Sequence, residues 1–341
     1  MVIKVAINGF GRVGRMVLKA GMDDPEIEFV AINDLTDNHT LAHLFKYDSV
    51  HGRFKGKIEA TESTIHINNQ EIKTFAEKDP EKLPWKELDV DVVIEATGRF
   101  RSNTLAYKHV KAGAKKVLVS APCGCDLNKE GVCEILIKTL VLGCNETEYN
   151  GEPVISNASC TTNCLAPVIK VINDNFKIKT GFVTTVHAYT ADQRLVDSPH
   201  KDLRRARAAA LNIVPTTTGA AKAVAEVVPE VAGKIDAIAI RVPVADGSLT
   251  EFVCEVEKET SVEEVNALFK SVAEHELKNI IEYSEEPLVS TDIIGNPHSA
   301  IFDALSTTVL NEKLIKVLAW YDNEFGYSSR LIDVIKIIAN K

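Results

Sequence analysis

The sequence predicts a two-domain protein of α/β plus α+β type, with a parallel sheet in the first domain and a largely antiparallel sheet in the second. In the first half, short apolar strands alternate with helical patterns, and the first strand runs directly into a glycine-rich turn. In the second half, long strand patterns at 249–256 and 315–321 favour antiparallel pairing. The 341 residues are enough for two hydrophobic cores.

Composition excludes several classes of function. The hydrophobic share of 45% and the charged share of 26% are ordinary for a globular enzyme. The net charge of −9 argues against nucleic acid or an anionic membrane as a partner. No signal-peptide layout and no apolar run of roughly 20 residues is found, and the seven cysteines are an odd number. We therefore expect a cytoplasmic protein with free thiols.

The N-terminal segment predicts a dinucleotide site. A buried strand at 2–7 is followed by glycines at 9, 11 and 14 and then by a helical pattern. In this arrangement Gly9 permits the tight turn, Gly11 lets the backbone approach a pyrophosphate, and Gly14 lets the helix pack on the strand. The motif alone is weak, but its strand and helix context is right on both sides. We expect a Rossmann-type dinucleotide-binding domain.

Three further strand ends supply candidate cofactor contacts. The strand at 28–33 ends at Asp34, which can accept hydrogen bonds from a ribose and would repel a 2′-phosphate, so NAD is favoured over NADP. Thr97 and Ser120 follow two later strands. Ligands of open α/β sheets bind beyond the carboxyl ends of strands, although each residue is also compatible with an ordinary loop position.

Cys160 is the candidate nucleophile. It lies in the segment Ser-Asn-Ala-Ser-Cys-Thr-Thr-Asn-Cys at 156–164, where a short strand gives way to an apolar helical pattern. A helix N-terminus favours an anion, either a thiolate on Cys160 or a phosphate held by Ser159 and Thr161. We place the domain boundary here, with 1–159 binding the cofactor, 160–323 forming the catalytic domain, and a helix at 324–341 packing back on the first domain.

The second half offers partners for this cysteine. His187 directly follows a predicted strand at 179–186 and is a candidate base, although a lone histidine is more often structural. The basic run at 198–207 is either a solvated face or a source of phosphate-binding guanidinium groups. Arg241 lies in an apolar strand and needs an anionic partner. The hydroxyl-rich segment 215–222 begins another helix and is a second place for an anion.

The remaining cysteines predict no metal site. The spacing of Cys123, Cys125, Cys133 and Cys144 does not match paired C-x-x-C ligands, and no histidine lies among them. We interpret them as buried or loop thiols.

Taken together, these segments resemble the phosphorylating glyceraldehyde-3-phosphate dehydrogenase family over essentially the whole chain. The resemblance rests on the glycine turn at 7–12, the cysteine segment at 156–164, His-Ala-Tyr-Thr at 187–190, the basic segment at 200–207, and Trp-Tyr-Asp-Asn-Glu at 320–324. It implies NAD-dependent oxidation of glyceraldehyde 3-phosphate through a Cys160 thioester that inorganic phosphate cleaves. A close alternative is an erythrose-4-phosphate dehydrogenase that releases the acid by hydrolysis. The family expectation is a homotetramer, with residues 188–212 at subunit contacts.

The resemblance also assigns roles residue by residue. Cys160 is the nucleophile and His187 the residue that lowers the thiol pKa and accepts protons. The resemblance implies that Thr190 and Arg241 bind the phosphate of the substrate. It implies that the incoming phosphate is bound by Ser159, Thr161, Arg205, Thr218 and Gly219. The cofactor contacts are Gly9, Arg12, Val13, Asp34, Ser120 and Asn323, with Tyr327 packed near the nicotinamide.

Two positions depart from the family pattern. Lys78 stands where an arginine commonly lies beside the adenine, which keeps the charge but loses guanidinium stacking. Ser198-Pro199 replaces the Leu-Pro of many NAD-specific relatives and removes an apolar side chain that would crowd a 2′-phosphate. We therefore predict a preference for NAD with some acceptance of NADP.

Overall fold

The computed structural model describes residues 2–128, 130–133 and 135–340, and the chain forms two compact units. Unit 1 contains Met1–Leu140, Thr147–Ala158 and Ser328–Lys341, and unit 2 contains Val141–Glu146 and Ser159–Tyr327. The chain thus changes unit after Ala158 and after Tyr327, whereas the predicted boundaries lie after 159 and 323. The excursion at 141–146 was not predicted.

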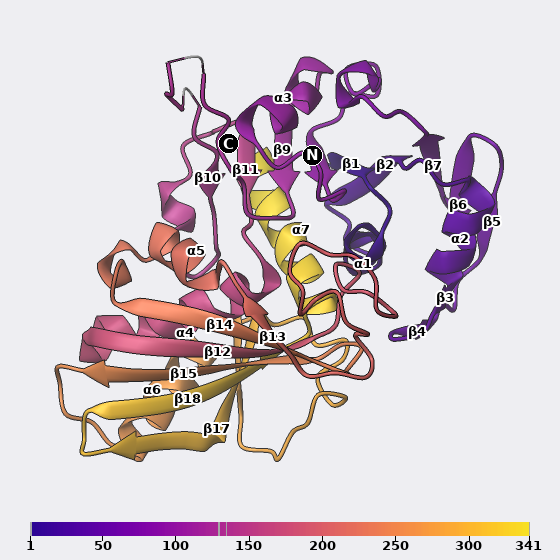
Figure 1. Cartoon of the computed structure of the whole chain (residues 1–341). Helices are drawn as coiled ribbons and strands as arrows, with labels where there is room; N and C mark the ends of the chain where they lie inside the picture. The colour runs from indigo at the N-terminus through magenta and orange to yellow at the C-terminus, as the bar shows by residue number, and fades with distance from the viewer. Residues whose placement is uncertain (1, 129, 134, 341) are drawn as a thin grey trace. The chain divides into compact units, whose positions relative to one another are not determined.

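Unit 1 is built on a nine-stranded sheet in the order β10-β11-β9-β8-β1-β2-β7-β6-β5 (Figure 1). All neighbours from β10 to β7 are parallel, and β6 and β5 continue the edge in antiparallel pairing. The strands are β1 (Ile3–Asn8), β2 (Ile27–Asn33), β5 (Ile58–Ala60), β6 (Thr64–Ile67), β7 (Gln70–Phe75), β8 (Val92–Glu95), β9 (Lys116–Val119), β10 (Lys138–Thr139) and β11 (Val154–Ser156). A separate ribbon joins β3 (Tyr47–Asp48) to β4 (Gly52–Arg53).

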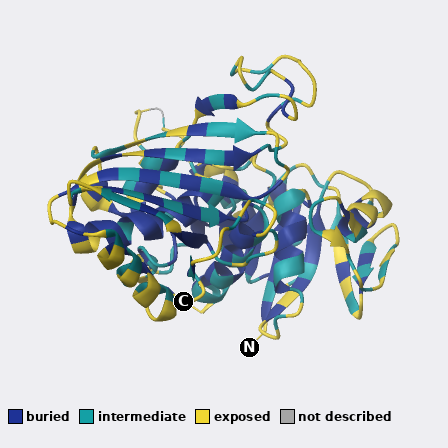
Figure 2. Ribbon diagram, turned by 90° about the horizontal axis from the view of Figure 1, so that it is seen from below, coloured by how far each residue is buried: buried dark blue, intermediate teal, exposed yellow. Residues whose placement is uncertain are grey.

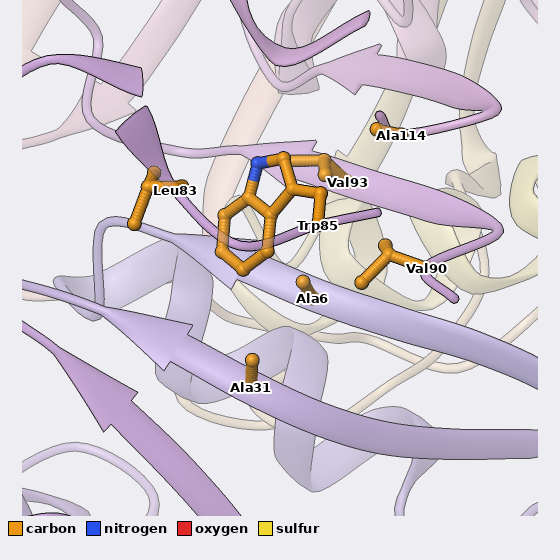
Figure 3. Packing of buried hydrophobic residues seen from close by; sticks show 7 residues of the cluster. All are labelled: Ala6, Ala31, Leu83, Trp85, Val90, Val93 and Ala114. Carbon is orange, nitrogen blue, oxygen red and sulfur yellow. The ribbon is translucent and has the colours of Figure 1, made fainter. Parts of the chain in front are cut away.

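The helices of this unit are α1 (Arg12–Gly21), α2 (Asn38–Lys46) and α3 (Asn103–Lys111), with a 3₁₀ turn at Pro80–Lys82. Most of α7 (Phe325–Ala339) also belongs here, where Lys336 Nζ lies 2.5 Å from the Asp24 carboxylate. Trp85 is completely buried, and Figure 3 shows its indole among apolar side chains that include Ala6, Ala31 and Val93 of the sheet. Small residues beneath the ring let the strands and the Trp85 segment pack closely.

Strand order places a switch point beside β1, because the chain runs from β1 to β2 on one side and later returns to β8 on the other. Open α/β sheets bind ligands beyond the strand carboxyl ends at such a point. Gly9, Asp34 and Thr97 follow β1, β2 and β8 at this edge. Ser120 follows β9. All four candidate cofactor contacts that follow strands therefore belong to unit 1.

Unit 2 is built on a seven-stranded sheet in the order β13-β14-β12-β15-β18-β17-β16. Its strands are β12 (Ile178–Ala188), β13 (Val214–Thr217), β14 (Ile235–Val242), β15 (Ser248–Val256), β16 (Ile281–Ser284), β17 (Ala300–Leu310) and β18 (Leu314–Tyr321). Four of the neighbouring pairs are antiparallel, while β12–β14 and β16–β17 are parallel. The sheet is thus largely antiparallel, as predicted.

Three helices pack against this sheet, namely α4 (Cys160–Phe176), α5 (Ala220–Val227) and α6 (Val262–Glu274). Short 3₁₀ turns occur at Glu146–Glu148 and Pro229–Val231. Along β15 and β18 buried residues alternate with more exposed ones, which Figure 2 shows as bands of colour across the strands. One face of the sheet is therefore packed under helices, and the other is open to solvent. Within the described part of the chain, no helix has the length and hydrophobicity of a membrane span.

Candidate active site

The candidate nucleophile lies on the first residue of α4. Ser159 caps the helix, because its Oγ accepts a hydrogen bond from Thr162 N at 3.2 Å. The residue before the cap, Ala158, has a φ of 53°, a left-handed conformation that costs energy for a residue with a side chain. The predicted helix start at Cys160 is confirmed.

The Cys160 thiol faces a histidine. Its Sγ lies 3.5 Å from Nε2 of His187, a residue of β12 that is buried. Nδ1 of His187 lies 2.7 Å from the carbonyl oxygen of Ala188, which can only accept a hydrogen bond. In the tautomer with the proton on Nδ1, this nitrogen donates to Ala188 O, and Nε2 presents its lone pair to the thiol. In the other tautomer Nδ1 would accept from Arg241 Nη1, which lies 2.9 Å away, and Nε2 would carry the proton. A neutral imidazole with its proton on Nδ1 can act as a base toward Cys160.

Arg241 stands beside the pair because β14 runs parallel to β12 with Arg241 in register with His187. Its Nη1 donates to Ala188 O at 2.9 Å and to Thr190 Oγ1 at 3.4 Å, and it lies 2.9 Å from His187 Nδ1. The predicted strand ended before His187, but β12 continues through His187 to Ala188. This extension is what brings the imidazole and the guanidinium together.

Burial and charge set the protonation states. Burial, and next the charge of Arg241, lowers the pKa of His187 to about 3, so the imidazole is neutral at physiological pH. Burial raises the pKa of the Cys160 thiol, while the charge of Arg241 opposes that rise. Burial also lowers the pKa of Arg241 itself. At physiological pH the pair is thus a thiol and a neutral imidazole. The largest charge stabilising a thiolate comes from Arg241, not from His187 as predicted.

Two hydroxyl-bearing residues outside the predicted set tie the site together. Tyr321 OH lies 3.0 Å from Thr161 Oγ1 and 3.0 Å from Thr185 Oγ1, so it joins the start of α4 to β12. All three residues are buried. Sequence reasoning missed Tyr321 and Thr185, although Tyr321 belongs to the Trp-Tyr-Asp-Asn-Glu segment, and its place beside Asn323 was the available signal.

The residues predicted to hold incoming phosphate fall into two groups. Arg205 Nε donates to Thr216 Oγ1 at 2.9 Å and Nη2 to Thr217 O at 3.0 Å, and Nη1 also pairs with Asp192. Its partners are thus the residues just before Thr218 and Gly219. Gly219 begins α5 and has no side chain to cap the helix, which leaves backbone N–H groups for an anion.

The second group is Ser159 and Thr161, whose hydroxyls are already engaged. Ser159 Oγ pairs with Thr162, and Thr161 Oγ1 with Tyr321. Among the contacts of the described residues, none joins Arg205 to either of them. The residues within each group therefore lie close together, but among the described residues no hydrogen bond joins one group to the other.

The glycine turn of unit 1 fits a dinucleotide. Gly9 has a φ of 95°, and a Cβ there would lie 2.8 Å from Thr97 N, so only glycine is tolerated. At Gly11, in contrast, no described heavy atom lies within 4 Å of the place a Cβ would take. Gly11 precedes the first helical residue and has no side chain to cap α1. An uncapped helix start with an open approach is what a pyrophosphate requires.

Three of the other predicted cofactor contacts of unit 1 already form hydrogen bonds or ion pairs within the protein. Asp34 accepts a hydrogen bond from Phe10 N at 2.8 Å, so the carboxylate also braces the glycine turn. Arg12 Nη1 lies 2.9 Å from the buried carboxylate of Asp48. Ser120 Oγ donates to Glu95 O at 3.0 Å. Val13 lies in the first turn of α1, and Lys78 is exposed on the segment after β7.

A buried polar network lies under these contacts and was not predicted. Glu95 accepts hydrogen bonds from Asn8 Nδ2 at 2.5 Å and from Thr97 N at 2.8 Å, and its side chain is completely buried. His109 Nε2 lies 3.1 Å from the same carboxylate, and His109 Nδ1 accepts from Trp85 Nε1 at 3.0 Å. Every oxygen of this buried acid is satisfied, which holds the ends of β1 and β8 in place.

Comparison with known proteins identifies the chain. Residues 3–103 match the family model for the glyceraldehyde 3-phosphate dehydrogenase NAD binding domain, and residues 159–323 match that for the C-terminal domain. The chain is 58% identical over 339 residues to glyceraldehyde-3-phosphate dehydrogenase of Thermotoga maritima, covering 98% of each chain. It is 54% identical over 343 residues to that of Geobacillus stearothermophilus, covering 100% of this chain and 99% of the relative. This chain belongs to the glyceraldehyde-3-phosphate dehydrogenase family.

Membership of the glyceraldehyde-3-phosphate dehydrogenase family confirms several predictions. The predicted family, the Rossmann-type domain with its second catalytic domain, and NAD as the cofactor are all confirmed. The chain is an NAD-dependent oxidoreductase. The roles of individual residues are not decided by the comparisons.

One prediction about the cysteines was wrong. Cys125 and Cys133 form a disulfide rather than two free thiols, with Cα atoms 5.9 Å apart. The turn between them, closed by Gly131 N donating to Asn128 O at 3.0 Å, brings the two sulfurs together. An odd total of seven does not exclude one local pair, which spacing alone could not reveal. Cys123 and Cys144 are thiols that take no part in the disulfide, and burial raises the pKa of Cys144.

The two C-terminal cofactor residues are both buried in unit 2. Asn323 follows β18, and its Oδ1 accepts a hydrogen bond from Ser248 Oγ at 2.6 Å. Tyr327 lies in the first turn of α7. Ser248 was not among the predicted residues, and nothing in its local sequence pointed to it.

Proposed function

We propose that this chain oxidises D-glyceraldehyde 3-phosphate with NAD and inorganic phosphate to 1,3-bisphosphoglycerate, through a thioester on Cys160. The observation that carries the proposal is the Cys160 Sγ facing His187 Nε2 at 3.5 Å, with Arg241 beside them. Attack on the aldehyde of a phosphorylated substrate requires three groups, namely a thiol, a base and a buried cation. The names of the relatives point to the same substrate.

In the first step His187 acts as a base. As Cys160 Sγ bonds to the aldehyde carbon, the thiol proton moves to His187 Nε2, and His187 then returns it to the aldehyde oxygen. The product is a hemithioacetal. The Nδ1–H bond to Ala188 O keeps the imidazole in the required tautomer during both transfers.

In the second step the substrate carbon would lose a hydride, for which bound NAD would supply the acceptor. His187 Nε2 takes the hydroxyl proton of the hemithioacetal at the same time, which leaves a thioester on Cys160. In the third step a phosphate oxygen attacks the thioester carbonyl, the carbon–sulfur bond breaks, and the acyl phosphate leaves. His187 returns its proton to the departing sulfur, so the site ends as it began.

Two groups of residues would hold the two phosphates. We assign the substrate phosphate to Arg241 and Thr190, whose guanidinium and hydroxyl lie 3.4 Å apart. The incoming phosphate would be bound by Ser159, Thr161, Arg205, Thr218 and Gly219. No observation favours hydrolysis of the thioester, as in the erythrose 4-phosphate alternative, over attack by phosphate.

Residues from several segments of the chain are proposed to hold the cofactor. We assign the pyrophosphate to Gly9, Gly11, Arg12 and Val13 at the uncapped start of α1, and the adenosine ribose to Asp34. Thr97, Ser120 and Lys78 are further proposed contacts, and Asn323 and Tyr327 would contact the nicotinamide.

A homo-oligomer, by family analogy a homotetramer, is part of the proposal. The open face of the unit 2 sheet exposes Phe182 and Leu305 by 69% and 61%. In the segment 188–212, Leu203 and Leu211 are more than four-fifths exposed, at 81% and 82%. Apolar surface of this kind favours burial against other copies of the chain. A monomer mass by light scattering would contradict this. The cytoplasmic location, and the absence of nucleic-acid or membrane partners, remain predictions.

The deciding experiment is an NADH absorbance assay with glyceraldehyde 3-phosphate, NAD and inorganic phosphate. We expect sustained NADH formation with all three present, and a single turnover per site when phosphate is omitted. Steady turnover without phosphate would contradict the thioester-phosphorolysis proposal and favour hydrolysis. Replacing NAD by NADP should lower kcat/KM, and equal or higher values with NADP would contradict the role of Asp34.

A further inference from the structure

Ser248 is a completely buried residue at the start of β15, and its hydroxyl joins two parts of the candidate site. Its Oγ lies 2.6 Å from Oδ1 of Asn323, which follows Asp322 just after the end of β18. The same Oγ lies 3.1 Å from the backbone nitrogen of Ala188, the residue that follows His187. One hydroxyl thus bridges the end of the histidine strand and an amide side chain.

The direction of each hydrogen bond follows from counting protons. The N–H of Ala188 can only donate, so Ser248 Oγ accepts that bond. The hydroxyl proton must then find an acceptor, because Ser248 is buried and an unmatched donor there is costly. Asn323 Oδ1 is that acceptor, whereas the amide turned the other way would place an N–H₂ group against the hydroxyl and leave its proton unmatched.

The amide of Asn323 is therefore held in one orientation. Its Oδ1 is occupied by Ser248, and its Nδ2 is the side that stays available as a donor. Within the described part of the chain, no group accepts a hydrogen bond from Nδ2. Asn323 is 8% exposed, and a bound ligand can take up this donor.

We propose that Ser248 is a positioning residue that presents Asn323 Nδ2 to the carbonyl oxygen of the nicotinamide carboxamide. The proposal rests on the proposed function, in which Asn323 contacts the cofactor. Ser248 fixes which end of the Asn323 amide meets the ring and ties that amide to the residue following the catalytic histidine. The site then selects for the carboxamide carbonyl and is indifferent to the carboxamide N–H₂.

Binding of an NAD analogue to the unaltered protein tests this selectivity. The probe is 3-acetylpyridine adenine dinucleotide, which keeps the carbonyl oxygen and replaces the amide nitrogen by a methyl group. We expect calorimetric Kd values for NAD and the probe to agree within about threefold, because no hydrogen bond to Asn323 is lost. A Kd for the probe more than about tenfold weaker than for NAD would overturn the proposal.

Substitution of Ser248 gives the second measurement. Ser248→Ala should weaken binding of NAD and of the probe by about five- to tenfold, because the Asn323 amide is no longer held. Ser248→Thr keeps the hydroxyl and should restore most of the affinity. Thr250→Val is the matched control, since it removes another buried hydroxyl from β15 that bonds Ala319 O at 3.3 Å and has no contact with Asn323. Unchanged Kd values in Ser248→Ala would overturn the proposal.

The two proposals fail separately. If the unaltered protein forms no NADH from glyceraldehyde 3-phosphate, the proposed function fails, while the binding comparison still reports on Ser248. If the protein turns over normally but Ser248→Ala binds both dinucleotides as before, the positioning role alone fails.

Discussion

Cys160 and Cys164 lie one turn apart on α4, and their sulfurs occupy opposite kinds of environment. Cys160 is partly exposed and faces the imidazole of His187. Cys164 is buried, with Sγ 3.4 Å from Thr250 Oγ1 and 3.9 Å from Ala319 O. The first sulfur meets a base and a nearby cation, and the second meets only neutral groups of the sheet.

The comparison shows that charge and access distinguish the two thiols more than burial does. Burial raises the pKa of both, to about 12 for Cys164. Only at Cys160 does a cation, Arg241, oppose that rise. Only Cys160 has a base within reach of its proton. A helix start alone therefore does not make a thiol reactive, and four predictions follow from the difference between the two sites.

The largest expected effect is on catalysis. Cys160→Ser should lower kcat by at least about 10⁴-fold, because a hydroxyl is a far weaker nucleophile and does not form the thioester. Cys164→Ser should leave kcat within about threefold of the unaltered enzyme and lower only stability. The NADH assay measures the first effect and urea denaturation the second. Equal losses of kcat in the two variants would show that the sites are not distinct.

Alkylation tests the same contrast without turnover. Iodoacetamide should modify Cys160 at least about a hundredfold faster than Cys164, because only Cys160 combines access with a nearby base and cation. Peptide mass spectrometry of the native protein over time gives both rates. Parallel labelling of the two cysteines would contradict the distinction, and unfolded protein, in which both should react alike, is the control.

Removing the cation should reduce the difference between the thiols. Arg241→Gln should slow alkylation of Cys160 at neutral pH by about tenfold, because the charge that opposes the raised pKa is lost. His187 remains neutral in this variant, since burial is the larger cause of its lowered pKa. Arg241→Lys should retain much of the rate, and Cys164 should not change. An unaltered Cys160 rate in Arg241→Gln would show that the guanidinium does not stabilise the thiolate.

The last prediction concerns the pH dependence of stability rather than the reactivity of a thiol. The pKa of His187 is lowered from 6.5 to about 3, so between these values the unfolded chain binds a proton that the folded protein does not. The contribution of neutral His187 to the free energy of unfolding is therefore fully present above pH 6.5. It is lost as pH falls through this window, by up to about 1.4 kcal/mol per pH unit. His187→Asn should remove this dependence, and Thr250→Val, beside Cys164, should retain it. Urea unfolding at about pH 7 and about pH 5 measures the difference, and parallel curves for all three proteins would contradict it.

The sequence by itself determined the features that depend on neighbours along the chain. The strand, glycine turn and helix at 3–21 follow from local pattern, because Gly9 and Gly14 are required by the turn itself. The helix start at Cys160 was predicted from the change of small polar residues to an apolar period of 3.6. The two-domain plan and the largely antiparallel second sheet also followed from patterns of this kind.

Only the tertiary structure decided which distant residues meet. Arg241 reaches His187 because parallel strands pair in one register, and that register depends on packing of the whole sheet. Tyr321, Thr185 and Ser248 were missed for the same reason, since their hydroxyls find partners 60 or more residues away. The Cys125–Cys133 disulfide needed the geometry of a turn. Local propensity places a residue on an element, but strand order and register decide which side chains share a site.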